Sequence, residues 1–214
     1  MGIIRSGVFS GFRKKVGNVS GAFFRDLNVI KTLPRPSGKA PTQKQIDQRN
    51  KFGLITGFLS SMSDLIDAGY MKGSSTSPMN EAVAYHLKNA ITGVAPNFTM
   101  DYTKIRFSNG KLSIPATFSV DVTTPGKVDF NWSLDGTDHK YKDATDMINV
   151  LVYNPTKHQF VSLMAAAQRS ALTFSLQMPP DFVGDSVHCF FSFSSLRKKN
   201  LNSKSVYVIF IPIA

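Results

Sequence analysis

The C-terminal half of the chain is built from short segments in which apolar and polar residues alternate. Val128, Phe130, Trp132 and Leu134 fall at every second position, which predicts one buried strand face. Similar segments are expected to form strands at Tyr102–Phe107, Thr117–Val122, Ile148–Val152, Gln159–Leu163, Leu172–Met178, Val187–Phe193 and Val206–Ile211. Turn signals such as Asn109-Gly110 separate them. Residues 98–214 are therefore predicted to form an antiparallel β-sandwich or barrel.

One tryptophan inside a predicted strand is typical of an immunoglobulin-like sandwich, and we expect that architecture here. Cys189 is the sole cysteine, so the disulfide of a true immunoglobulin domain is absent. A single cysteine also excludes a disulfide framework within one chain and a Cys-based zinc site. Because Cys189 alternates with Val187 and Phe191, we interpret it as a small core residue rather than a nucleophile.

Residues 42–97 have the signature of a helical segment. Thr42 and Gln45 form a capping box, and an apolar stripe at three- and four-residue steps runs from Ile46 to Ile66, with Gly69 ending the helix. A second helix is predicted to begin with Ser77 as its cap and Pro78 at its first position, and to end at Gly93. The expected class is α+β, consisting of an N-terminal arm, two helices and a β-sandwich.

The charge of the chain is concentrated at its beginning. Residues 1–51 contain eleven Lys and Arg against two Asp, whereas the remaining residues are nearly neutral. Residues 1–41 are also rich in Gly and Phe, and Pro34, Pro36 and Pro41 separate them from the helices. We expect short β segments or extended chain here, including a strand within Leu27–Leu33.

Such a basic arm predicts a polyanion or a neighbouring subunit as its partner, although a merely solvated arm has the same composition. The candidate contacts to polyanion or subunit are Arg5, Arg13, Lys14, Lys15, Arg25, Lys31 and Arg35. The candidate anchors of the arm are Phe9, Phe12, Phe23 and Phe24.

Candidate catalytic chemistry is sparse in this sequence. None of the four histidines lies at metal-ligand spacing from another, and the Asp-bearing stretch 135–146 does not match a calcium-binding loop. Glu81 is the only glutamate, which removes the usual carboxylate pair of a glycosidase. We therefore expect no catalytic residues, no cofactor, no metal site and no enzymatic activity.

The N-terminal part of the sequence lacks an apolar run of the length that a secretory signal requires, and the apolar stretch Val206–Ile213 is far too short for a membrane-spanning helix. We expect the protein to be made in the cytoplasm without an N-terminal signal peptide. Its final location, whether the cytoplasm, a particle or the extracellular space, is left open.

Four segments carry a resemblance to other proteins: residues 1–21 (MGIIRSGVFSGFRKKVGNVSG), Leu33–Ser37 (LPRPS), Thr42–Phe52 (TQKQIDQRNKF) and Tyr85–Gly93 (YHLKNAITG). They resemble an uncharacterised family of Bacteroidota proteins, most strongly over the first 100 residues. The Gly-rich start, Arg-Pro and the T-x-x-Q-x-x-x-R-x-x-F helix are also loosely similar to small phage structural proteins. The family resemblance implies a bacterial origin and supplies no catalytic residues.

Together these features favour a noncatalytic structural protein that assembles with copies of itself, as a filament or a particle. The basic arm of residues 1–41 and sheet edges of the body would join the subunits. The alternative is a protein that binds nucleic acid non-specifically through the basic residues of 5–51. A β-sandwich hydrolase or a carbohydrate-binding module is the least favoured, because neither a carboxylate pair nor an aromatic platform is evident.

Overall fold

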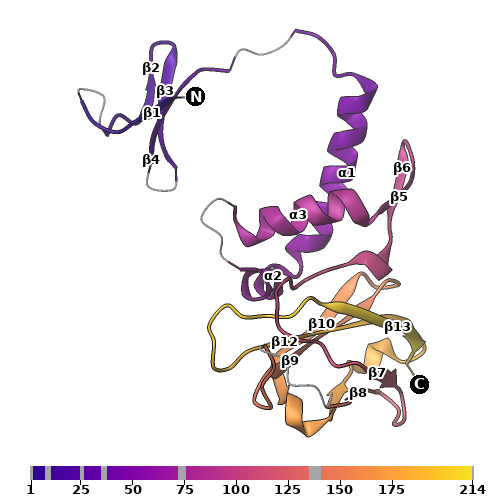
Figure 1. Ribbon diagram of the computed structural model, residues 1–214. Coiled ribbons are helices and arrows are strands. Elements are labelled where there is room, and N and C mark those ends of the chain that lie inside the picture. The colour runs from indigo at the N-terminus through magenta and orange to yellow at the C-terminus, as the bar shows by residue number, and fades with distance from the viewer. Residues whose placement is uncertain are drawn as a thin grey trace. The chain divides into compact units, whose positions relative to one another are not determined.

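Antiparallel sheets and three helices make up the computed structural model, which describes residues 2–7, 11–24, 27–34, 38–71, 76–134 and 141–213 (Figure 1). The expected α+β class is confirmed. The chain divides into two compact units, Met1–Thr42 and Gln43–Ala214, and each is described by itself below. The second unit contains both the predicted helical segment and the predicted β region.

The first unit is a four-stranded antiparallel sheet in the order β1-β4-β3-β2. Its strands are β1 (Gly2–Ile4), β2 (Lys14–Val16), β3 (Val19–Phe24) and β4 (Leu27–Thr32). The prediction of short β segments, with a strand within Leu27–Leu33, is confirmed. A tight turn at Gly17 and Asn18 joins β2 to β3, and Gly17 has a φ of 55°, which glycine adopts without strain.

The second unit begins with three helices, α1 (Gln43–Ser60), α2 (Ser63–Gly69) and α3 (Pro78–Asn89). The predicted first helix is interrupted at Ser61 and Met62, so it forms two helices. The predicted start of the second helix is confirmed, because the Ser77 side chain accepts a hydrogen bond from the Asn80 backbone N–H at 3.3 Å and Pro78 follows it. None of the helices in the described part of the chain is both long and apolar enough to cross a membrane.

The predicted end of that second helix is wrong. The helix ends at Asn89, and Ile91 begins a β-hairpin of β5 (Ile91–Val94) and β6 (Asn97–Met100). Gly93 has a φ of 84°, and a Cβ atom there would lie 2.4 Å from the Asn97 carbonyl oxygen. The hairpin therefore needs glycine at a position that also resembles a helix stop signal.

Two sheets form the rest of the second unit. One has the order β10-β9-β12-β13, with β9 (Met147–Asn154), β10 (Gln159–Gln168), β12 (Ser186–Ser194) and β13 (Val206–Pro212). The other has the order β11-β8-β7, with β7 (Phe118–Asp121), β8 (Lys127–Trp132) and β11 (Thr173–Gln177). These strands confirm the predicted ones, with bounds that differ by a few residues.

The strand predicted at Tyr102–Phe107 is absent. Tyr102–Lys104 instead forms one turn of 3₁₀ helix, because the Asp101 side chain accepts a hydrogen bond from the Thr103 backbone N–H at 3.0 Å. Leu134 is a second exception, because β8 ends at Trp132 and leaves the Leu134 side chain 48% exposed. Val128, Phe130 and Trp132 are buried on one face as expected.

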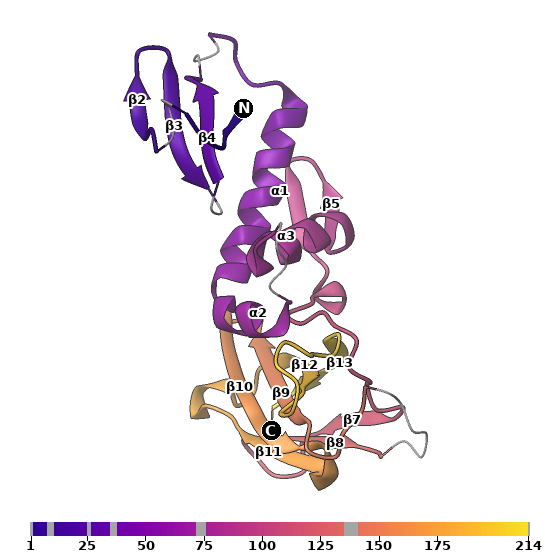
Figure 2. The same ribbon diagram turned by 60° about the vertical axis from the view of Figure 1, so that its left-hand side comes forward.

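Strands β9 and β12 are buried on both faces, between the helices and the three-stranded sheet (Figures 1 and 2). Val150 and Val152 of β9 belong to a core that also contains Phe130 and Trp132 of β8. Leu151 of β9 faces the other way, into a core shared with the helices. This double burial explains the run of consecutive apolar residues Val150–Tyr153 in β9 and Cys189–Phe191 in β12.

The expected immunoglobulin-like sandwich is not confirmed. Strand β13 lies beside β7, and β10 lies beside β11. No hydrogen-bonded ladder joins either pair among the described strands, so the two sheets stay open rather than closing on one another.

Candidate interaction surface

The register of the N-terminal sheet gathers apolar side chains on one of its faces. Side chains alternate along a strand, and directly paired residues share a face. Ile3 pairs with Val29, Ala22 pairs with Val29 and Phe24 pairs with Leu27, so these five residues form what we name the apolar face. Ile3, Phe24 and Leu27 are 52%, 58% and 42% exposed, whereas Val29 is buried.

The opposite face carries two other predicted anchors, Phe12 and Phe23. The chain at Phe12 crosses Gly21 so closely that a Cβ atom there would lie 2.3 Å from the Phe12 carbonyl oxygen. Phe12 is therefore half-buried within its own unit. Phe23 is 49% exposed, and the Arg13 guanidinium lies 5.1 Å from the centre of its ring.

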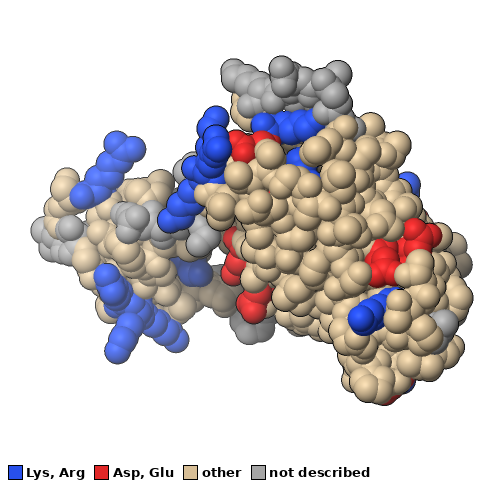
Figure 3. Space-filling model, turned by 90° about the horizontal axis from the view of Figure 1, so that it is seen from below, with Lys and Arg blue, Asp and Glu red and all other residues tan. Residues whose placement is uncertain are grey.

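The described basic contacts lie on both faces of this sheet. Lys15 and Lys31 flank Ser20 in one row across three strands, on the same side of the sheet as the apolar face. Arg5, Arg13 and Lys14 are exposed as well, and the described residues of this unit include no Asp or Glu (Figure 3). The surface therefore suits a partner that is apolar in part and neutral or negative in charge.

Three of the predicted residues, Phe9, Arg25 and Arg35, lie outside the described residues. Of the rest, the sheet brings Lys15 together with Lys31 and Arg13 with Phe23. Phe24 lies across from Leu27, a residue that composition alone does not single out. The alternation within β4 is the signal that could have found it.

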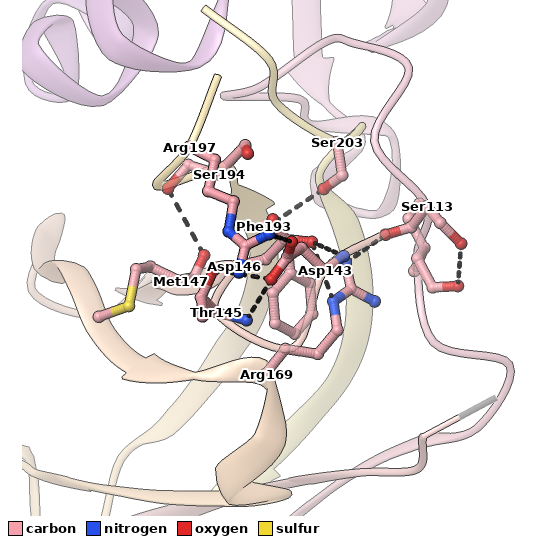
Figure 4. Close-up of polar contacts among 12 residues, drawn as sticks. Ser113, Asp143, Thr145, Asp146, Met147, Arg169, Phe193, Ser194, Arg197 and Ser203 are labelled. Atoms are coloured by element: carbon pink, nitrogen blue, oxygen red, sulfur yellow. Dashed lines mark hydrogen bonds and ion pairs between the residues drawn. The ribbon is translucent and has the colours of Figure 1, made fainter. Parts of the chain in front are cut away.

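A buried ion pair in the second unit is the polar cluster that sequence reasoning missed (Figure 4). Arg169 Nε lies 3.4 Å from Asp146 Oδ2, and both side chains are about fully buried, at 1% and 0% exposed. Arg169 Nη2 donates a hydrogen bond to the Ser113 carbonyl oxygen at 2.6 Å. The guanidinium also lies 4.2 Å from the centre of the Phe193 ring.

The acidic residues of this cluster are already engaged. Burial raises the pKa of Asp146, although the Asp143 backbone N–H and Arg169 oppose the shift. Asp143 pairs with Arg197 at 3.0 Å, and the backbone N–H of Thr145 holds the pKa of Asp143 below its ordinary value. The Asp-bearing stretch therefore offers little free negative charge at these two positions, and Asp135 and Asp138 lie outside the described residues.

Two further groups with reactive side chains are packing residues. Cys189 is buried in the β core, as predicted, and burial raises the pKa of its thiol to about 12. His86 is buried on α3, where its Nδ1 donates to the Ala82 carbonyl oxygen at 2.6 Å and its Nε2 accepts from the Arg106 backbone N–H at 3.0 Å. Across the described residues, no three His, Cys, Asp or Glu side chains are grouped so as to hold a metal ion.

Comparison with known families assigns the chain to a family. The model of a family of unknown function, DUF6266, matches residues 11–209. The chain therefore belongs to the DUF6266 family, and the match includes β2, β3 and β4 of the N-terminal sheet as well as the helices. A comparison with curated proteins finds no match.

Proposed function

We propose that the chain is a noncatalytic structural protein that assembles with copies of itself through its N-terminal sheet. The exposed apolar face of that sheet carries the proposal. A sheet normally buries one face against another layer, and a unit of about 40 residues has too small a core to be stable alone. Covering the remaining exposed half of Phe24 or Leu27 would contribute roughly 1 kcal/mol each, because fully burying such a side chain contributes roughly 1.5–3 kcal/mol.

The edges of the sheet support the same function. Strands β1 and β2 are the outer strands of the sheet, and each pairs on one side only. Outer strands present unpaired backbone groups to which another strand can add. Assembly then grows where the face or edge of one subunit meets a different surface of the next, and such head-to-tail contacts produce filaments when they do not close.

The segment that connects the two units is long enough for the N-terminal sheet to contact another subunit. Residues 33–42 contain no helix or strand in their described part, and Pro34 and Pro41 favour extended backbone. Ten residues span at most about 35 Å, so the sheet can contact a neighbouring subunit. The resemblance to a Bacteroidota family and the looser likeness to phage structural proteins support a bacterial assembly protein made in the cytoplasm.

Sedimentation velocity on nuclease-treated protein tests this proposal. We expect the wild-type chain to sediment as large species, and the double variant Phe24→Gln, Leu27→Gln to sediment as a monomer. The control is Leu196→Gln, because Leu196 is 68% exposed but lies in the second unit. A wild-type chain that is monomeric at every concentration refutes the proposal, and so does a double variant that assembles as the wild type does.

Non-specific nucleic-acid binding through residues 5–51 is the second candidate. The row of Lys15, Ser20 and Lys31 favours it, because two cations and a hydroxyl on one flat face suit a phosphate backbone. Replacing Arg13, Lys14 and Lys15 by Gln should weaken binding to all sequences alike. The slope of log K against log salt should fall by about 0.9 for each phosphate of duplex DNA that the variant no longer neutralises. Unchanged affinity in fluorescence anisotropy titrations would exclude Arg13, Lys14 and Lys15 as contacts to nucleic acid.

A further inference from the structure

An aromatic pocket lies in the second unit, between α1, the β5–β6 hairpin, β9 and β10. Its volume is about 540 Å³, within the range of roughly 300–1,000 Å³ that is usual for small-molecule sites. Its lining is mostly apolar and aromatic and includes Gly57, Phe58, Tyr102, Tyr153, His158 and Phe160. No Asp, Glu, Lys or Arg is among the residues that line it.

The rings of the pocket hold one another in fixed orientations. The Phe58 ring meets the Tyr153 and Phe160 rings edge-on, with centroid distances of 5.2 and 5.1 Å. The Tyr102 ring lies 5.1 Å from the Tyr153 ring at a tilt of 42°. These distances are those of favourable aromatic pairs, so the rings support one another and form a rigid wall of the pocket.

A hydrogen-bonding pair stands in this aromatic wall. Tyr153 Oη lies 3.2 Å from His158 Nδ1. His158 ends the turn after β9, in which Asn154 Oδ1 accepts hydrogen bonds from the backbone N–H groups of Thr156 and Lys157 at 2.9 and 3.2 Å. Burial raises the pKa of the Tyr153 hydroxyl, so it remains a hydrogen-bond donor across the neutral range.

Gly57 keeps the pocket open on the side of α1. Apart from its chain neighbours and the backbone of α1, no atom lies within 4 Å of the position that a Cβ atom would occupy there, and Gly57 lines the pocket. Glycine inside a helix costs about 1 kcal/mol relative to alanine. A larger side chain at this position would project into the pocket, so the glycine preserves its volume.

We propose that this pocket binds a small, uncharged aromatic compound that carries a hydrogen-bonding group. The ring would pack against the open sides of Phe58 and Phe160, and its polar group would reach the exposed His158 imidazole, whose Nδ1 is paired with the buried Tyr153 hydroxyl. The absence of charged lining residues disfavours an ionic ligand, which would be desolvated without a counter-charge. A saccharide would bury several hydroxyls among rings that leave them unpaired. The inference is independent of the assembly proposed above.

Ligand-observed NMR on the full chain tests the proposal, with indole as the probe and cyclohexanol as its non-aromatic counterpart. We expect saturation transfer to indole but not to cyclohexanol. The variant Gly57→Leu should weaken indole binding roughly tenfold or more. The matched control is Gly53→Leu, because Gly53 lies one turn earlier on α1, also has open space around it, and does not line the pocket.

Several results would overturn the proposal. These are no saturation transfer to indole, equal transfer to cyclohexanol, or equal indole binding by both glycine variants. Circular dichroism must show that both variants fold; if Gly57→Leu does not, Gly57→Met takes its place. A further outcome is that the wild type does not bind indole and Gly57→Leu no longer assembles. The pocket would then hold a side chain of another copy, which refutes the small-ligand proposal but not the assembly.

Discussion

Replacing Arg169 by methionine should be among the most damaging single changes in the second unit. The substitution keeps the apolar stem of the side chain but removes the guanidinium. The ion pair with Asp146, the hydrogen bond to the Ser113 carbonyl oxygen and the packing against the Phe193 ring disappear with it. Asp146 remains, fully buried and without its counter-charge.

The magnitude follows from that burial. Removing one partner of a buried ion pair costs about 3–5 kcal/mol, because the other charge is left uncompensated. Arg197 supplies the matched control, since it pairs with Asp143 at 3.0 Å but its side chain is 70% exposed. An exposed ion pair contributes about 0–1 kcal/mol. Arg197→Met should therefore be nearly neutral.

Urea unfolding followed by the emission of Trp132 measures both variants. Trp132 is the only tryptophan of the chain, and its Nε1 donates a hydrogen bond to the Arg169 carbonyl oxygen at 2.7 Å. The probe therefore reports the region that is changed, and the backbone partner survives the substitution. If Arg169→Met loses no more stability than Arg197→Met, the buried pair does not stabilise the fold and the reasoning is wrong.

Three further predictions concern the second unit. Native Trp132 emission should be that of a buried indole, and Trp132→Ala should cost about 3–5 kcal/mol; water-exposed emission would contradict this. Burial lowers the pKa of His86, so the unfolded chain binds a proton first and stability should fall as pH decreases below about 6.5. Urea midpoints that do not change between about pH 7.5 and 5.5 would argue against this. Gly57→Ala should raise the melting temperature, because open space surrounds Gly57 and alanine favours a helix over glycine. Gly69→Ala should lower the melting temperature, because the added Cβ atom would lie 2.4 Å from the Phe107 carbonyl oxygen.

The strands were largely predictable because a half-buried strand has a two-residue period that is visible in the sequence. The end of the second helix was predicted wrongly because the same residues fit two local patterns, the end of a helix and a β-hairpin. Ile91 and Gly93 fit the end of an apolar helix stripe, and they fit a hairpin strand with a glycine at positive φ equally well. Only pairing with Asn97–Met100 decides between them.

The candidate sites were predictable only in part. Composition marked the basic and aromatic residues of the N-terminal sheet, but the register decides that Phe12 packs within its own unit while Phe24 stays exposed. The aromatic pocket and the Arg169 cluster were not predicted, because their residues are far apart in the chain. Ser113, Asp146 and Arg169 have no common local pattern, and tertiary folding alone brings them together.

The position of β12 has a consequence for how the chain folds during its synthesis. β12 lies between β9 and β13 in the sheet, although it follows β9 by more than 30 residues in the chain. While the ribosome is translating the residues between them, β9 has no neighbour on that side, and its apolar side chains lack much of their cover. A nascent chain that stalls before Ser194 would therefore expose apolar side chains and an unpaired strand edge, to which chaperones and other nascent chains can bind.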